Sequence, residues 1–483
     1  MTDPAFQSAK SLAGLVRRGR VGCLELLDHF IARVERYDGQ LNAVVVRDFE
    51  RARKRARAMD RKGAKAEGGP LFGVPMTVKE SFDIAGLPTT WGDPAFKDTR
   101  ATRDALAVRR LAAAGAVIFG KTNVPLNLAD WQSFNAIYGT TNNPWDTALS
   151  PGGSSGGAAA ALAAGLTGLE VGSDIGASIR NPAHYCGVFG HKPTWGICPP
   201  LGQALGGAVA QSDISVIGPM ARSAADLALA LDVIAGPEEI EARGLRLALP
   251  PPRVKGFAGL RVAIMATDPN LDTDDELVGK LEELGKFLRR QGAKVSTTAR
   301  PEFDTRAAHR NYVLMLRATT SARQSDAAME TWRRVAARLG PEDNTYLGLM
   351  ARGNIMSHRD FLRLDEERQV MRRAWGAFFR EWDVLLCPAA ASAAQPHDHK
   401  GERHERLITV NNKRVPTTDQ LFWAGISCHF LLPGTVAPLG FTSAGLPLGV
   451  QIVGPQYGDR ATIHLAHLLE RAWQGFVPPP GFA

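Results

Sequence analysis

Apolar residues near the start of the chain recur at the spacing of an α-helix. Between Leu12 and Val34 many of them fall three or four positions apart, which places them on one face of a helix. Residues 43–63 are also predicted to be helical, and they carry many basic side chains. These patterns predict an N-terminal helical layer over residues 1–68.

Beyond residue 70, short apolar runs alternate with helical segments. Strands are predicted for Met76–Val78, Ala116–Phe119, Leu169–Val171, Leu260–Met265 and Val384–Pro388. Helices are predicted for Arg103–Ala113, for Ala158–Ala164, and for two segments that start at Ser223 and Thr273, with Asp226 and Glu276 as their capping partners. This alternation predicts an α/β architecture with a largely central sheet.

The second half of the chain has a different pattern. Residues 303–380 lack strand signals and are rich in Arg, Ala and Glu, which predicts a helical excursion. Residues 391–419 are polar and are predicted to be irregular. Residues 431–483 are expected to complete the sheet with two strands, Val436–Gly440 and Leu446–Val453, followed by a helix over 461–472.

The composition is that of an ordinary globular protein. The 483 residues are 45% apolar and 22% charged, with a formal net charge of +8. The basic cluster from Arg51 to Lys62 has alanines between its charges, so a solvated helix face is favoured over a nucleic-acid patch. We therefore expect no nucleic-acid partner.

Cysteines and apolar runs indicate the compartment. The five cysteines are scattered and form no CxxC pair, which predicts neither a disulfide framework nor a zinc site. The first residues lack the basic and apolar regions of a signal peptide, and no apolar run reaches the ~18 residues that cross a bilayer. A cytoplasmic protein without a membrane partner is expected.

The stretch from Ser150 to Arg180 carries the most distinctive chemistry. A turn of glycine and serine, Pro151–Gly157, precedes the alanine-rich helix, and a second turn, Gly172–Ser178, follows the next strand. Turns of small residues expose hydroxyl groups and backbone N–H groups, which a hydrolase uses as nucleophile and as oxyanion donors.

A serine nucleophile needs a base, and two side chains are candidates for it. His184 lies six residues after Ser178. Lys79 follows a buried strand, where burial would favour its neutral form. Spacing alone leaves both candidates open.

Two other kinds of site are disfavoured. The glycine-rich turn lacks the lysine of a phosphate-binding P-loop. His397, His399 and His404 lie in a polar segment without cysteine, which is more typical of surface residues than of a metal site. We expect neither a metal nor a cofactor.

Several ordered motifs together resemble the amidase signature family of serine hydrolases. They are Gly73-Val-Pro75 with Lys79, Gly120–Asn123, Pro151–Gly157, Gly172–Arg180, Cys186-Gly187, Lys192-Pro-Thr194, Gly445–Gln451 and Gly454-Pro455. The resemblance covers about residues 70–236, the signature core, and about 430–470. It implies one large domain over residues 1–483, in which helices cover both faces of a central mixed β-sheet.

The resemblance also implies a catalytic triad of the Ser–cis-Ser–Lys type. The nucleophile falls on Ser178, the bridging serine on Ser154, with a cis peptide bond before it, and the base on Lys79. The oxyanion hole falls on the backbone N–H groups of Ile175, Gly176, Ala177 and Ser178. Structural support falls on Ser155, Asp174 and Arg180.

One position departs from the family pattern. Ala177 stands where the family usually has a second glycine. If that position required a positive φ, a side chain would strain the turn. We expect instead that the position accepts a methyl group, which slightly narrows the acyl pocket, and that the enzyme is active.

The substrate pocket is less well defined by the motifs. By position it falls on Leu126–Phe134, where Leu128, Ala129 and Trp131 offer an apolar surface, although Trp131 suits the core equally well. Further candidates are Gly153 and Trp423, and residues 303–430 are expected to form the mouth. No basic side chain of the motifs is expected to hold a substrate carboxylate, since Arg180 is assigned a structural role.

The expected reaction is hydrolysis of a neutral aryl or hydrophobic carboxamide by water, through an acyl-enzyme. Three alternatives stay open. The same triad suits a carbamate or ester hydrolase, the family includes the glutaminase subunit of a tRNA-dependent amidotransferase, and a family member can act as a binding protein without catalysis. A homodimer is also left open.

Overall fold

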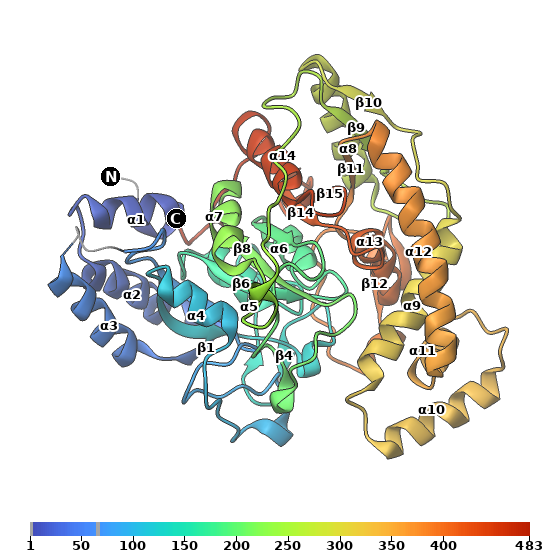
Figure 1. The fold of residues 1–483 in the computed structure, drawn as a ribbon, viewed down its shortest axis with the longest axis horizontal. Helices are drawn as coiled ribbons and strands as arrows, with labels where there is room; N and C mark the ends of the chain where they lie inside the picture. Colours follow the sequence, from blue (N-terminus) through green and yellow to red (C-terminus); the bar gives the residue numbers. More distant parts are fainter. Residues whose placement is uncertain (1–2, 64–67) are drawn as a thin grey trace.

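The computed structural model describes residues 3–63 and 68–483 (Figure 1). Its largest sheet has eight strands, in the spatial order β10 (Lys294–Ser296), β9 (Arg261–Ile264), β11 (Val384–Pro388), β15 (Pro447–Val453), β14 (Gly434–Phe441), β7 (Phe189–Lys192), β8 (Val216–Ala221) and β6 (Glu170–Asp174). The pairs β10–β9 and β9–β11 are parallel, and the other pairs are antiparallel. The mixed sheet of the α/β prediction is therefore confirmed.

A second sheet of three strands lies beside β6. Its order is β1 (Val44–Arg47), β3 (Val117–Thr122) and β2 (Pro75–Lys79). Two hairpins complete the strands: β4 (Phe134–Asn135) with β5 (Gly139–Thr140), and β12 (Leu407–Val410) with β13 (Lys413–Pro416). The strands are thus divided between separate sheets, which the sequence pattern did not indicate.

Helices surround the sheets. They are α1 (Ala9–Arg17), α2 (Cys23–Leu41), α3 (Phe49–Lys62), α4 (Leu106–Ala113), α5 (Gly156–Ala163), α6 (Arg180–Cys186), α7 (Ala224–Ile234), α8 (Asp275–Arg290), α9 (Thr305–Ser321), α10 (Asp326–Leu339), α11 (Tyr346–Asn354), α12 (His358–Glu381), α13 (Leu421–Cys428) and α14 (Asp459–Ala472). Helices α1–α4 lie at one end of the molecule and α9–α12 at the other (Figure 1). The predicted helical excursion over 303–380 is confirmed. None of the helices described is long and apolar enough to cross a bilayer.

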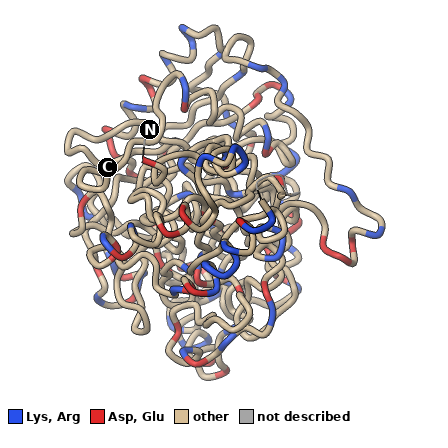
Figure 2. The backbone as a smooth tube through the Cα atoms, turned by 90° about the vertical axis from the view of Figure 1, so that its left-hand side faces the viewer, with Lys and Arg blue, Asp and Glu red and all other residues tan. Residues whose placement is uncertain are grey.

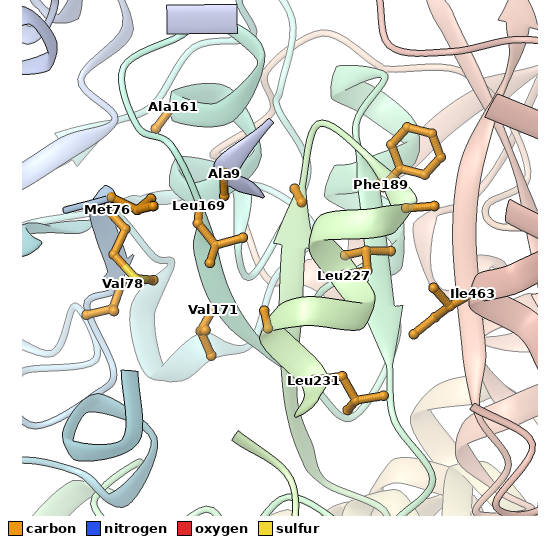
Figure 3. Packing of buried hydrophobic residues seen from close by; sticks show 14 of the residues in the cluster. Ala9, Met76, Val78, Ala161, Leu169, Val171, Phe189, Leu227, Leu231 and Ile463 are labelled. Carbon is orange, nitrogen blue, oxygen red and sulfur yellow. The ribbon is translucent and has the colours of Figure 1, made fainter. Parts of the chain in front are cut away.

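The two sheets meet along β2 and β6, a junction that positions the site. Met76 and Val78 of β2 belong to one buried apolar cluster with Leu169 and Val171, at the start of β6 (Figure 3). Across the same junction, the Thr77 hydroxyl donates a hydrogen bond to Glu170 Oε1 at 2.5 Å. Apolar packing and side-chain hydrogen bonds therefore bring the end of β2 close to the end of β6.

Three local predictions were wrong. Residues 44–47 are a strand rather than helix, because the Val44–Val46 run favours strand and pairs with β3. The helix predicted from Thr273 has Asp274 as its N-cap, whose carboxylate accepts from the Glu276 N–H. The supposedly irregular segment 391–419 holds the β12–β13 hairpin, whose two-residue loop, Asn411-Asn412, has positive φ at both positions.

The predicted N-terminal layer is helical apart from β1. Its residues 1–2 and 64–67 lie outside the described residues. On α3, Arg53 pairs with Asp28 and Glu50, so part of the basic cluster is neutralised. Figure 2 shows Lys and Arg interspersed with Asp and Glu along the chain.

Candidate active site

A cavity of about 490 Å³ opens at the end of β6. It is lined by Ser154 and Ser178, the two serines that the family resemblance places in the triad and that are called the motif serines below. Its lining includes Ser154, from the turn before α5, and Ser178, from the turn between β6 and α6. Most of the remaining lining is apolar or small, and comes from residues 91–96, 127–131, 200–215 and the end of α9. Segments far apart in the sequence therefore meet around the two serines.

Lys79 is the last residue of β2 and is completely buried. Its Nζ donates to Ser154 Oγ at 2.7 Å and to Ser173 Oγ at 3.0 Å. The peptide bond between Gly153 and Ser154 is cis, as the resemblance implies. The side-chain nitrogen thus lies in contact with one hydroxyl from each of the two motif turns.

Burial decides the protonation of Lys79. It lowers the pKa of the amine from 10.5 to about 7, against the opposing effect of Asp174 and Glu170. Burial also raises the pKa of Glu170 to about 8, so this acid is mostly uncharged at neutral pH. A neutral Glu170 does little to hold a proton on Lys79, which leaves the amine available as a base.

Asp174 shapes the turn that carries Ser178. Its carboxylate accepts from the N–H groups of Ala177 at 2.9 Å and Ile179 at 3.1 Å, and from Arg180 Nη2 at 2.9 Å. The Arg180 guanidinium and these hydrogen bonds hold the pKa of Asp174 well below its usual range, despite burial. Ser155 adds a backbone N–H bond to the carbonyl of Ser178 at 3.1 Å. Asp174, Arg180 and Ser155 therefore all take part in hydrogen bonds at the turn that carries Ser178.

Two side chains outside the turn fix the direction of its peptide groups. Trp131 Nε1 donates to the Gly176 carbonyl at 2.8 Å, and the Tyr312 hydroxyl donates to the Ile175 carbonyl at 2.9 Å. The C=O and N–H of a trans peptide unit point in opposite directions, so the bond from Tyr312 turns the Gly176 N–H the other way. Trp131 therefore lines the cavity and also anchors the turn.

The N–H groups of this turn differ in availability. Those of Ile175, Gly176 and Ser178 have no hydrogen-bond acceptor within the described part of the chain. The Ala177 N–H donates to the Asp174 carboxylate. It was expected in the oxyanion hole, but this hydrogen bond occupies it. Three donors remain for a developing negative charge.

The expectation for the Ala177 backbone was also wrong. Its φ is +72°, in the left-handed region that glycine occupies without a penalty. An L-residue there costs about 1–2 kcal/mol. The methyl group is therefore held in a strained turn rather than in a position that accepts it freely.

His184, the other candidate base, lies elsewhere. Its Nδ1 accepts from the Gly449 N–H at 2.6 Å and its Nε2 lies 2.9 Å from the Ser392 carbonyl. The ring is buried, and burial lowers its pKa to about 4. Both ring nitrogens are occupied by backbone groups, so His184 is a structural residue.

The predicted pocket residues divide into two groups. Leu128, Ala129 and Trp131 line the cavity. Gly153 and Trp423 are absent from the lining found over the described residues. Trp423 is fully buried in an apolar cluster beside β11, and a side chain at Gly153 would meet the backbone of Gln132. Those two assignments were wrong because neither position faces the cavity.

The structure adds residues that the motifs did not single out. Ser173 lies between Lys79 Nζ and Gln203, whose Nε2 donates to Ser173 Oγ at 3.2 Å. Tyr312 belongs to the segment 303–430 that was expected to form the mouth, and its hydroxyl instead bonds to the turn that carries Ser178. Three arginines from outside the motifs also line the cavity, namely Arg317, Arg323 and Arg403. Ser173 stands inside a motif, but the others carry no local signal, because their contacts depend on the fold.

The histidines of the polar segment have no metal-binding arrangement around them. Over residues 3–63 and 68–483, no group of three or more His, Cys, Asp and Glu side chains is arranged to hold a metal ion. His399 instead stacks on Phe134, with 3.8 Å between ring centroids.

Comparison with known proteins identifies the family. The family model described as Amidase matches residues 25–463. The chain belongs to the amidase signature family. It is an amidase, a hydrolase that acts on amide C–N bonds.

Relatives of this amidase differ in what their names say they act on. It is 33% identical to an indoleacetamide hydrolase of Bradyrhizobium diazoefficiens, over 97% of this chain and 87% of the relative. It is also 33% identical to a glutamyl-tRNA(Gln) amidotransferase subunit from an Anaeromyxobacter species, over 94% of each chain. A solved bacterial aryl acylamidase of the amidase signature enzymes superposes with a TM-score of 0.82 at 24% identity, over 97% and 96% of the two chains, which supports the fold alone.

Proposed function

We propose that this amidase hydrolyses a small carboxamide with an aryl or otherwise hydrophobic body, through an acyl-enzyme on Ser178. The observation that carries the proposal is the contact of a buried Lys79, whose pKa is lowered to about 7, with Ser154 in the cavity that also holds Ser178. A neutral amine beside a hydroxyl is a general base, and a serine nucleophile requires one.

The proposed reaction begins with proton transfer. Neutral Lys79 accepts the hydroxyl proton of Ser154, and Ser154 accepts the hydroxyl proton of Ser178. At the same time the Ser178 oxygen bonds to the amide carbon. The N–H groups of Ile175, Gly176 and Ser178 stabilise the oxyanion; loss of one such donor typically costs about 2.7–4 kcal/mol. The C–N bond then breaks and the leaving amine takes the proton back. Water repeats the sequence on the acyl-enzyme and releases the acid.

The apolar wall of the cavity supports an aryl or hydrophobic substrate. Trp91, Phe96, Leu128, Trp131 and Leu316 all line it. Such surfaces bind flat apolar groups, with a few polar groups fixing their orientation. The name of one relative, an indoleacetamide hydrolase, points the same way.

A substrate panel tests this proposal. The panel contains arylacetamides, acylanilides, aliphatic amides, glutamine, aryl carbamates and aryl esters, with products read by chromatography. We expect the highest kcat/KM for an aryl amide. Preferred hydrolysis of glutamine would instead favour the glutaminase function, and preferred hydrolysis of carbamates or esters would favour those classes.

Labelling tests the nucleophile separately. A fluorophosphonate probe should add its mass to Ser178 in the wild-type protein and not in Ser178→Ala. An unlabelled wild-type protein would favour a binding protein without catalysis.

Three further features belong to the same proposal. The cavity lining includes Leu316, Arg403 and Leu421, in keeping with a mouth formed by residues 303–430. All five cysteines are free and buried, which suits a reducing, cytoplasmic compartment. The only partners that the proposed reaction needs are the amide and water.

A further inference from the structure

Two arginines and a tyrosine from three separate segments meet beside the cavity, near the end of α9. We define the Arg–Tyr cluster as Arg317, Tyr346 and Arg403. Arg317 Nη2 and Arg403 Nη2 both donate to the Tyr346 hydroxyl oxygen, the second at 3.1 Å. Arg317 and Arg403 line the same cavity as the motif serines. Two cations therefore converge on one neutral oxygen at the substrate cavity.

Arg317 is partly buried and lacks the partners that a guanidinium withdrawn from water normally has. Its Nε is buried without an acceptor, and its contacts within the described residues supply one acceptor, Tyr346 Oη. Among the described residues, no carboxylate is among the groups that shift the pKa of Arg317. Charges that are withdrawn from water are normally paired, so an unpaired, partly buried cation that faces a ligand cavity indicates a missing anion.

Arg403 and Arg323, the third arginine of the cavity lining, also lack a carboxylate within ion-pair distance among the described residues. Arg403 donates to the Ala129 carbonyl at 2.9 Å and lies 5.2 Å from the Trp131 ring centroid. The Arg323 guanidinium lies 4.2 Å from the ring centroid of Trp91. These contacts orient the arginines without neutralising them.

The acids that line the cavity do not neutralise the cluster. Asp174 is paired with Arg180, and Asp130 with Arg406. Asp93 caps a short turn through its bond from the Ala95 N–H. Even if Tyr346 loses its proton, the two arginines leave the Arg–Tyr cluster with a net positive charge.

We propose that the Arg–Tyr cluster binds a carboxylate that the amide substrate carries away from its scissile bond. The proposal rests on the proposed amide hydrolysis and specifies its substrate class as an anionic amide with an apolar body. Guanidinium groups match a carboxylate in geometry and bind it through paired N–H donors. The expectation of a neutral substrate considered only the motifs, and these arginines lie outside them.

Matched substrate pairs test the proposal, because a nitro group is a planar, uncharged counterpart of a carboxylate. One pair is 4-carboxyphenylacetamide and 4-nitrophenylacetamide, in which the group lies on the acyl side. The other is the 4-carboxybenzyl and 4-nitrobenzyl amides of acetic acid, in which it lies on the amine side. Hydrogen bonds to a charged group are stronger than neutral ones, so we expect kcat/KM to favour the carboxylate in one pair by about 10- to 100-fold. Equal or lower values for the carboxylate in both pairs would overturn the proposal.

Substitutions in the Arg–Tyr cluster test whether these residues cause the preference for a carboxylate. Arg317→Gln should reduce the carboxylate-to-nitro ratio of kcat/KM to near one, mainly through KM, because the subsite lies away from the reacting bond. Arg334→Gln, on the exposed face of α10, is the matched control and should keep the wild-type ratio. If Arg317→Gln does not fold, Arg403→Gln takes its place. An unchanged ratio in a folded cluster variant would overturn the assignment to these residues.

A binding measurement separates this proposal from the reaction itself. Titration calorimetry of Ser178→Ala with the four amides reads the subsite without turnover. Tighter binding of a carboxylate amide, lost in the Arg317→Gln double variant, would support the subsite even if no amide were hydrolysed. Binding that is equal for carboxylate and nitro amides would contradict it even if both were good substrates.

Discussion

The pH dependence of kcat/KM provides a direct test of Lys79 as the base. Lys79 is completely buried, with its Nζ 2.7 Å from Ser154 Oγ. Burial lowers its pKa from 10.5 to about 7. The amine therefore becomes a proton acceptor near neutral pH, whereas a solvated lysine would do so only near pH 10.

The size of the effect follows from the two pKa values. With a pKa of about 7, the neutral fraction of Lys79 is roughly 9% at pH 6 and 91% at pH 8, so kcat/KM should rise about tenfold and then level off. With a pKa of 10.5, the same interval gives a rise of about a hundredfold with no plateau before about pH 10. The position of the plateau thus distinguishes a buried base from a solvated one.

The same change in pKa affects stability in a defined direction. Between about pH 7 and 10.5 the unfolded chain holds a proton on Lys79 that the folded protein has released. The free energy of unfolding contributed by this residue therefore rises with pH across that interval, by an upper limit of roughly 5 kcal/mol. Below about pH 7 both states are protonated, so this contribution is absent.

The assay measures initial rates from pH 5.5 to 9.5 at constant ionic strength, with an arylacetamide that has no titratable group in that range. Lys79→Met should lower kcat/KM by about a hundredfold or more and should lose the step near pH 7. Ser178→Ala supplies the background rate. A wild-type rate that still rises at pH 9, or a Lys79→Met protein that keeps the step, would refute the assignment.

Three further substitutions test other parts of the site. Ser178→Ala should abolish turnover while the far-UV circular dichroism stays unchanged, and residual activity above about one per cent would exclude Ser178 as the nucleophile. Ala177→Gly should raise the free energy of unfolding in denaturant by up to about 1 kcal/mol. The reason is that relief of the +72° φ outweighs the greater flexibility of glycine in the unfolded chain. A loss of stability would show that packing of the buried methyl group contributes more. Glu170→Gln should stabilise the protein by about 1–3 kcal/mol at pH 7 and by little at pH 4. The reason is that the raised pKa of Glu170 makes its burial increasingly unfavourable as pH rises from 4.5 to about 8. Equal effects on the free energy of unfolding at both pH values would contradict that pKa.

The sequence predicted elements with a strong local pattern. Buried strands such as β2 and β11 appear as short apolar runs, and the Ser223 cap of α7 was correctly placed because its hydroxyl accepts from the Asp226 N–H. Strand β1 was missed because its valines directly precede a basic helix. Turn chemistry at Asn411-Asn412 was a usable signal for the β12–β13 hairpin that was overlooked.

In the candidate site, too, residues with a local sequence signal were predicted and residues placed by long-range contacts were not. The motif serines and Lys79 were found because short motifs carry them. The wall of the cavity was not predictable, since its contacts join distant segments: Tyr312 reaches the carbonyl of Ile175 across 137 positions of the chain. The orientation of Trp423 was equally inaccessible, because an aromatic residue on an apolar helix suits a pocket and a core equally well.

The junction between β2 and β6 has a consequence for how this amidase should lose activity. Lys79 belongs to one sheet and Ser173 to the other. The described contacts across the junction include apolar packing, side-chain bonds such as Thr77 to Glu170, and one backbone bond, from the Gly168 N–H to the Pro75 carbonyl, but β2 and β6 share no backbone ladder. A small separation of the two sheets would break the proposed relay while each sheet kept its own backbone ladder. Thermal inactivation is therefore expected to precede the loss of secondary structure, so the half-life of turnover at a given temperature measures the integrity of this junction rather than global unfolding.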